Sequence, residues 1–75
     1  MFPINTATAA TVRDAIAQAE RTEVSVAKGA HITPSTWQRR IHGRTSFTVN
    51  DLSRISADLG VKIGDLVDTI ADKLR

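Results

Sequence analysis

The chemistry that this sequence can support is concentrated between residues 33 and 54. Four arginines lie in this window against a single carboxylate, Asp51, which gives it a net charge of +3, while the whole chain carries +2. Clustered guanidinium groups favour polyanions such as nucleic acids. Arginine is also common on solvated helices, so charge alone leaves a DNA-binding surface and an ordinary helix surface as equal alternatives.

The remaining reactive side chains form no recognisable catalytic or metal site. His31 and His42 have neither a cysteine nor a carboxylate cluster beside them, as a metal site would require. The spacing of Asp65, Asp68 and Asp72 fits a solvated helix face that points away from DNA, and it does not fit a calcium loop. No serine, histidine and aspartate are spaced as a triad, and a domain this small gives little shelter for chemistry. We therefore expect no enzyme activity, metal, cofactor or small-molecule ligand.

Length and composition indicate one small domain spanning residues 1–75. The chain has no cysteine, so the fold must rest on packing rather than on disulfides or a thiolate zinc site. No apolar run approaches the roughly eighteen residues of a membrane span. The first residues lack the basic and then apolar pattern of a secretory signal. We expect a cytoplasmic protein without membrane contact.

Periodicity and capping residues predict five helices and no sheet, which is an all-α class with a compact five-helix bundle. The first helix is expected from about residue 8 to residue 20. The second follows a cap at Thr22, buries Val26 and Ala27, and closes at residues 29–31. Linkers of a few residues keep the helices in a single bundle.

The third helix has the clearest start in the chain. Thr33 occupies the N-cap, and Pro34 falls at the first helical position, where its missing amide hydrogen costs nothing. Ile32 and Trp37 form a hydrophobic staple across the cap. Gly43 supplies the stop. Trp37 is therefore expected in the core.

The fourth helix repeats this arrangement. Thr48 is the cap, Asp51 stands where a capping-box acid belongs, and Phe47 staples to Leu52. Gly60 ends the helix.

The fifth helix is expected from about Gly64, and residues 63–75 are a possible dimerisation helix. Its apolar residues Ile70, Ala71 and Leu74 extend past what a minimal bundle needs. Two roles remain open for them, because they can hold a second copy of the chain or complete the core.

The outward face of the third helix has the properties that a DNA major groove requires. With Trp37 turned inward, this face is polar and has no acid, and the groove admits one such helix. Two arginines also have intramolecular roles: Arg40 can pair with an acid such as Asp51, and Arg54 is expected to be an ion-pair partner. The candidate DNA-binding residues are Thr33, Pro34, Ser35, Thr36, Gln38, Arg39, Arg40, His42 and Arg44.

Residues 9–67 resemble the lambda-repressor/Cro-type helix-turn-helix family. The similar segments are Thr22–Ala27, Ile32–Trp37, Gly43 and Phe47–Val61, and the ending Leu-x-x-Ile-x-x-x-Leu-Gly-Val is the most specific part. The resemblance implies a five-helix fold, a helix-turn-helix at about residues 22–43, operator DNA and usually a homodimer. It also implies base-reading positions at Pro34, Ser35 and Arg39 and phosphate positions at Thr33, Thr36 and Arg44.

The chain departs from the family pattern at three positions. The family usually has glycine where His31 stands, so His31 is expected to adopt a left-handed backbone at some cost. A glutamine that binds phosphate is common where Glu23 stands, and a carboxylate there would weaken the contact. Many members have an apolar residue where this chain has Arg40.

Two functions from different classes remain open at this point. The first is a transcriptional repressor of phage or bacterial origin, whose two subunits read operator half-sites about 34 Å apart. The second is a protein-interaction adaptor or antirepressor that uses the same fold without DNA. Salt distinguishes them, because DNA binding through arginines weakens steeply as salt rises.

Overall fold

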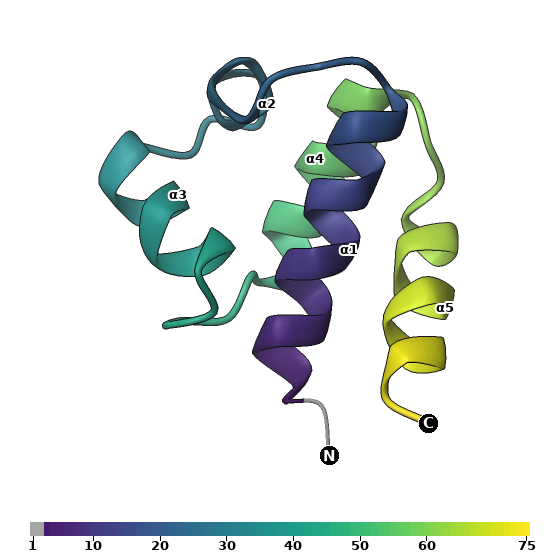
Figure 1. Cartoon of the computed structure of the whole chain (residues 1–75). Helices are drawn as coiled ribbons and strands as arrows, with labels where there is room; N and C mark the ends of the chain where they lie inside the picture. Colours follow the sequence, from purple (N-terminus) through teal and green to yellow (C-terminus); the bar gives the residue numbers. More distant parts are fainter. Residues whose placement is uncertain (1–2) are drawn as a thin grey trace.

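A computed structural model describes residues 3–75, which form five helices and no strand (Figure 1). The all-α five-helix prediction is confirmed. In chain order the helices are α1 (Ile4–Gln18), α2 (Glu23–Gly29), α3 (Pro34–Ile41), α4 (Val49–Leu59) and α5 (Ile63–Lys73).

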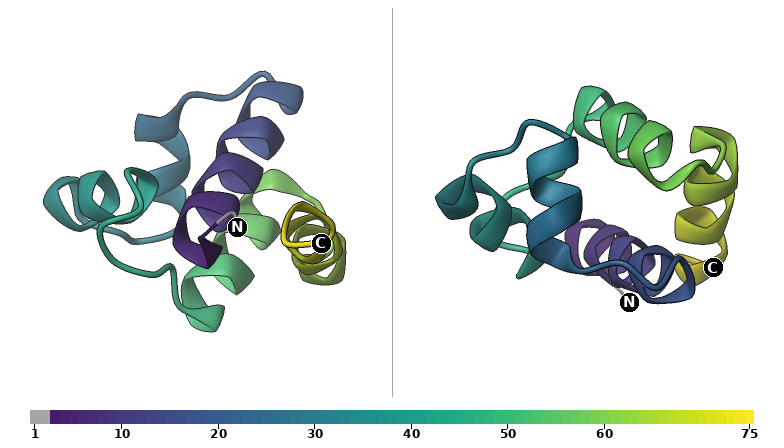
Figure 2. Two further views of the ribbon diagram at one scale, coloured as in Figure 1. Left: turned by 60° about the horizontal axis from the view of Figure 1, so that its bottom comes forward. Right: turned by 90° about the horizontal axis from the view of Figure 1, so that it is seen from above.

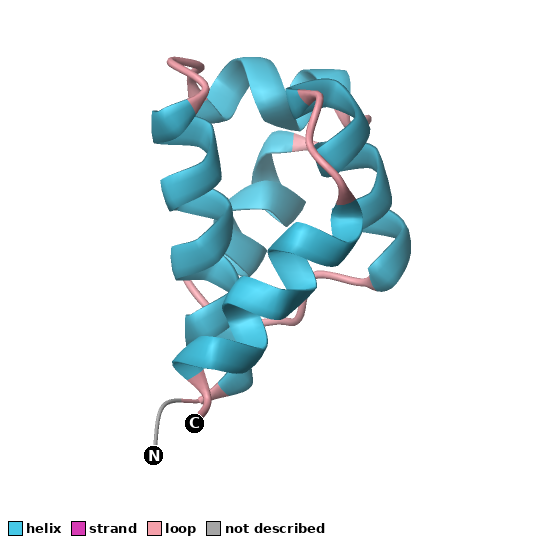
Figure 3. Ribbon diagram, turned by 90° about the vertical axis from the view of Figure 1, so that its right-hand side faces the viewer, coloured by secondary structure: helices cyan, strands magenta, loops and turns pink. Residues whose placement is uncertain are grey.

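Helix α1 is the central element of the bundle. It packs against α5, α3 and α2, while α4 packs against α2 and α5. The views in Figure 2 place α3 and α5 at opposite ends of the molecule. Only short loops join the helices (Figure 3). The arrangement therefore leaves one long side of α3 without a helix covering it.

A single apolar core joins the five helices. Its largest fully buried side chains are Trp37, Ile41 and Ile55. The rings of Trp37 and Phe47 meet edge to face, with centroids 5.5 Å apart and an interplanar angle of 72°, a geometry that aromatic pairs prefer. Ile70 of α5 also belongs to this core. Of the two roles open for Ile70, the structure favours completion of the monomer core, whereas Ala71 and Leu74 stay exposed.

Local hydrogen bonds stabilise two of the predicted helix starts, those of α2 and α4. In the capping box of α4, the Asp51 amide donates to Thr48 Oγ1 over 3.0 Å, and the Thr48 amide donates to Asp51 Oδ2 over 2.9 Å. The Ser25 amide donates to Thr22 Oγ1 at the start of α2. Thr33 occupies the N-cap of α3, but its hydroxyl donates to Thr36 Oγ1 instead of capping the backbone.

The first helix begins at Ile4. The sequence pattern had predicted a start near residue 8, so this prediction was wrong. The opening residues of the helix are mostly alanine, threonine and asparagine, so they carry little of the apolar periodicity on which the prediction depended. Ala7 and Ala9 are nevertheless buried, because small side chains let neighbouring elements approach α1 closely. Thr8 donates its hydroxyl to the Ile4 carbonyl over 2.8 Å and so satisfies its buried polar group within the helix.

Four helices end in a left-handed residue, and two of these residues are not glycine. Gly43 and Gly60 have φ of 78° and 72°, as expected for helix stops, while His31 has 59° and Glu20 has 55°. The left-handed backbone predicted at His31 is confirmed. After each of the four, the next residue's amide reaches back to a carbonyl of the preceding helix, which is the Schellman pattern. None of the described helices is long and apolar enough to cross a membrane.

We expect His31→Gly to raise the free energy of unfolding by about 1 kcal/mol, because glycine lacks the Cβ that strains a left-handed residue. His42 is a matched control, since it is an exposed histidine at a helix end with φ of −90°. There glycine relieves no strain, adds unfolded-state entropy and removes the ring whose Nδ1 lies 2.8 Å from the Gln38 carbonyl oxygen, so His42→Gly should lower stability by about 0.5–1 kcal/mol. Urea unfolding followed by Trp37 fluorescence measures both. Equal effects of the two substitutions would contradict the strain assigned to His31.

Candidate nucleic-acid interface

Burial of one side of α3 fixes which of its side chains reach solvent. Trp37 and Ile41 are 2% and 1% exposed and lie one turn apart on the inner side. Ser35, Gln38 and Arg39 are exposed on the other side. Their side chains are all neutral or positive, and all can form hydrogen bonds. This face therefore offers donors and acceptors without a carboxylate that would repel a phosphate backbone.

Most of the candidate DNA-binding residues lie on the surface of one continuous segment, 33–44. Two of them, Thr36 and Arg40, are only partly exposed. The exposed ones are Thr33, Pro34, Ser35, Gln38, Arg39, His42 and Arg44.

The turn that ends α3 couples Arg44 to the helix. The Gly43 amide donates to the Arg40 carbonyl over 3.1 Å, and the Arg44 amide donates to the Arg39 carbonyl over 2.9 Å. The left-handed backbone of Gly43 makes this closure possible. Arg44 thus follows the last turn of α3 as part of the same hydrogen-bonded unit. The backbones of the exposed residues Arg39 and Arg44 are therefore held in a fixed relative position.

His42 is also tied to the end of α3. Its Nδ1 lies 2.8 Å from the carbonyl oxygen of Gln38. Because a carbonyl oxygen can only accept, Nδ1 carries the proton in this contact. The ring satisfies a carbonyl at the helix C-terminus, and only Nε2 remains for an external partner.

Arg40 differs from its neighbours because a protein acid already holds it. Its Nη1 donates to Asp51 Oδ2, so the intramolecular role left open by the sequence is the one that the structure contains. Asp51 is buried, and its Oδ1 accepts from Arg54 Nη2 over 3.2 Å. Arg54 is therefore an intramolecular partner, as predicted. Arg40 is the least available arginine of the candidate set.

Glu23, at the start of α2, is the hydrogen-bond acceptor for Trp37, a core residue of α3. The Trp37 indole Nε1 donates to Glu23 Oε1 over 3.1 Å, and Arg13 Nε lies 3.9 Å from Glu23 Oε2. The sequence did not reveal this contact, although a buried indole N–H needs an acceptor and so signals that one must exist. Glu23 therefore links α2 to α3, and an exposed base partly offsets its charge.

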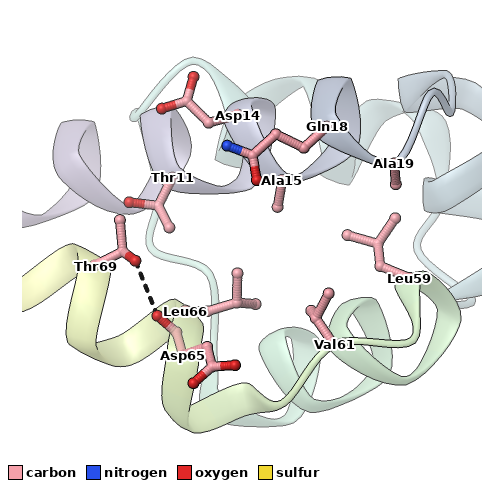
Figure 4. A pocket seen from close by; sticks show the side chains of 10 residues that line it. All are labelled: Thr11, Asp14, Ala15, Gln18, Ala19, Leu59, Val61, Asp65, Leu66 and Thr69. Atoms are coloured by element: carbon pink, nitrogen blue, oxygen red, sulfur yellow. Dashed lines mark hydrogen bonds between the residues drawn. The ribbon is translucent and has the colours of Figure 1, made fainter.

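Of two hollows in the surface of the described residues, one adjoins α3. This groove of about 310 Å³ lies between α2 and α3 and is lined by residues that include Val24, Ala27 and Gln38. The other, of about 420 Å³, lies between α1, the end of α4 and α5 (Figure 4), with Asp14 and Asp65 among its lining residues. This second hollow contains no candidate DNA-binding residue, and no metal-binding cluster occurs among residues 3–75.

The excess of positive charge lies at the α3 end of the molecule, because the three acids of α5 are matched in number by Lys62, Lys73 and Arg75. The exposed acids Asp65, Asp68 and Asp72 follow α5, at the opposite end from α3 (Figures 1 and 2). Arg39 and Arg44 lie on or next to α3 and form no ion pair among the described residues. A charge distribution of this kind orients a molecule in the field of a polyanion, with the basic end leading.

A family model for the Cro/C1-type helix-turn-helix DNA-binding domain matches residues 12–72. The chain belongs to this family. The similarity to the lambda-repressor/Cro-type family seen in the sequence is thereby confirmed. Curated proteins gave no sequence match.

A solved structure supports the fold of this Cro/C1-type domain. The crystal structure of the clp gene regulator ClgR from Corynebacterium glutamicum is similar with a TM-score of 0.86 at 20% sequence identity. The match covers 97% of this chain and 79% of that chain. At this identity the likeness concerns the fold.

The helix-turn-helix of this Cro/C1-type domain consists of α2, the turn at residues 30–33 and α3. In such motifs the second helix is the one that enters the major groove. The second helix of this pair is α3, whose outer face carries the exposed polar residues. Its eight residues span about 12 Å, which is short enough to lie within one groove.

We expect Glu23→Ala to lower the free energy of unfolding by about 1 kcal/mol, because the buried Trp37 indole loses its acceptor. Glu23→Gln keeps an acceptor oxygen and should lose less than half as much. Thermal and urea unfolding measure both variants, and a red shift of Trp37 emission in the alanine variant alone would report wetting of the indole. Equal losses would show that the hydrogen bond contributes nothing.

Proposed function

We propose that this protein is a sequence-specific DNA-binding transcriptional repressor of bacterial or phage origin, which inserts α3 into the major groove of its operator. One observation carries the proposal: the burial of Trp37 and Ile41 turns a polar, carboxylate-free face of α3 to solvent. Membership in the Cro/C1-type family supports it. The protein would act in the cytoplasm, where operator DNA lies.

Within this proposal, base reading belongs to the outer face of α3. Arg39 suits a bidentate contact with guanine and Gln38 a bidentate contact with adenine, because their paired groups match the major-groove edges. Ser35 and Pro34, in the first turn, lie where the helix enters the groove. All four are exposed, so no rearrangement of the core is needed to present them.

The flanks of α3 would contact the phosphate backbone. Arg44 follows the helix in a turn that its amide hydrogen bond to Arg39 holds in place. Thr33 and Thr36, at the other end, form a hydroxyl pair over 2.9 Å that can turn toward a phosphate. His42 adds its free Nε2. Phosphate contacts fix the register of the helix, and base contacts specify the sequence.

A homodimer would supply the second half-site. Ala71 and Leu74 are exposed on α5, and Val67 joins them at helical spacing with 49% of its surface exposed. Because α5 lies at the opposite end of the molecule from α3 (Figure 2), contact there would leave both recognition helices free. Operator half-sites would then lie about 34 Å apart, or a multiple of this.

The proposal is tested by selecting binding sites from random duplex DNA and measuring affinity at two ionic strengths. We expect enrichment of one short motif and an affinity that falls steeply as salt rises, because phosphate contacts release counterions. A protein-interaction adaptor would enrich no motif. No enrichment, or binding indifferent to salt, would overturn the proposal.

Two substitutions separate base reading from phosphate binding on the selected operator. Arg39→Ala should weaken binding by about 1–3 kcal/mol and relax the preference at one position. Arg44→Ala should weaken all sequences alike and reduce the salt slope by about one unit. Arg75→Ala is the control, because Arg75 is exposed beside Asp72 at the far end of the chain and should have little effect. An unchanged operator affinity for Arg39→Ala would contradict the placement of α3.

A further inference from the structure

Asp51 is a buried acid on which three donors converge. It is 2% exposed. Its Oδ2 accepts from Arg40 Nη1 and from the Thr48 amide, the latter over 2.9 Å, while its Oδ1 accepts from Arg54 Nη2 over 3.2 Å. Capping α4 uses only the Thr48 contact. The two guanidinium groups are therefore an addition that the helix start does not require.

The two arginines reach Asp51 from different helices. Arg54 belongs to α4 itself, three residues after Asp51. Arg40 belongs to the last turn of α3, and its contact with Asp51 crosses from α3 to the start of α4. The main packing partners of α3 are α1 and α2. The Arg40–Asp51 ion pair is thus a link between α3 and α4, beside the ring contact of Trp37 with Phe47.

Stability alone does not account for this link. Desolvating an ion pair offsets much of its attraction, and an apolar pair of similar size often stabilises a fold as well. Here the Nε atoms of Arg40 and Arg54 are also buried with no hydrogen-bond partner among residues 3–75. What a guanidinium–carboxylate contact adds is a fixed direction, because the planar guanidinium group accepts few geometries.

The ion pair of Arg40 can affect the orientation of the proposed DNA-binding residues Arg39 and Arg44. Arg40 follows Arg39 in the last turn of α3, and its carbonyl accepts the Gly43 amide in the turn that leads to Arg44. We infer that Arg40, held by Asp51, is a positioning residue for DNA recognition rather than a DNA ligand. It fixes the last turn of α3 against α4, so that Arg39 and Arg44 meet DNA in a single register. This inference rests on the proposed function.

The test compares Arg40→Met with Arg54→Met. Each variant removes one guanidinium from Asp51, but only the first breaks the link between helices. Arg40→Met should reduce the ratio of operator affinity to random-duplex affinity about tenfold and leave the salt slope unchanged. Arg54→Met should leave the ratio within about twofold of the unmodified protein. Amide hydrogen exchange without DNA should speed up in α3 for Arg40→Met alone. Arg40→Lys keeps the charge and should fall between, which also covers the case that Arg40→Met does not fold.

The alternatives give different results. A phosphate ligand at position 40 would show as equal weakening on operator and random DNA with a smaller salt slope, and this would overturn the inference. A purely structural role would lower the two ratios alike or raise exchange in all five helices, and this would overturn it as well. No DNA binding by the unmodified protein would overturn the proposed function and the inference together, whereas normal binding with equal effects of the two variants would overturn the inference alone.

Discussion

The burial of Trp37 is the constraint on which the rest of the interface depends. Three contacts hold the indole: an edge-to-face contact with Phe47, a hydrogen bond to Glu23 and the surrounding core. An indole this large is worth about 3–5 kcal/mol in a core, a large fraction of the 5–15 kcal/mol of total stability typical of domains. With Trp37 in the core, α3 cannot rotate about its own axis, and its polar side must face solvent.

The second organising feature is the contrast between arginines that are paired within the fold and arginines that stay exposed at α3. One group is tied up within the fold: Arg21 Nη2 donates to Asp58 Oδ2 over 2.8 Å, and Arg40 donates to Asp51. Gly29 lets Asp58 approach α2, because a Cβ on Gly29 would lie 2.3 Å from Asp58 Oδ1. Arg39 and Arg44, in contrast, stay exposed at α3 and form no ion pair among residues 3–75. The net charge of +2 is thus a poor indicator of what this protein binds, because the position of each charge decides which partner it can contact.

The sequence predicted the parts of the fold that local chemistry controls. The starts of α2 and α4 follow from Thr22 and Thr48, and the end of α3 follows from Gly43. The predicted start of α1 was wrong, because the alanine and threonine residues of its first turns form no apolar stripe that a sequence pattern could reveal.

Contacts between distant residues were the other limit of prediction. The acceptor of the Trp37 indole lies 14 residues away and depends on how α2 meets α3. No pattern in the sequence indicated the left-handed backbone of Glu20, because glutamate is not among the residue types enriched in that conformation. For Arg40 the sequence offered two partners, and only packing could show that Asp51 is within reach. Eight of the nine candidate DNA residues remain predictions about binding, and for Arg40 the contact with Asp51 favours a positioning role instead.

The most direct measurement of the central claim is an NMR titration of the isotopically labelled protein with its selected operator duplex. If α3 enters the groove, the largest amide shifts should fall on residues 33–44, the indole signal of Trp37 should shift little, and α5 should respond only if a second copy binds. Shifts centred on the α1–α5 side of the molecule, with residues 33–44 unaffected, would contradict the account.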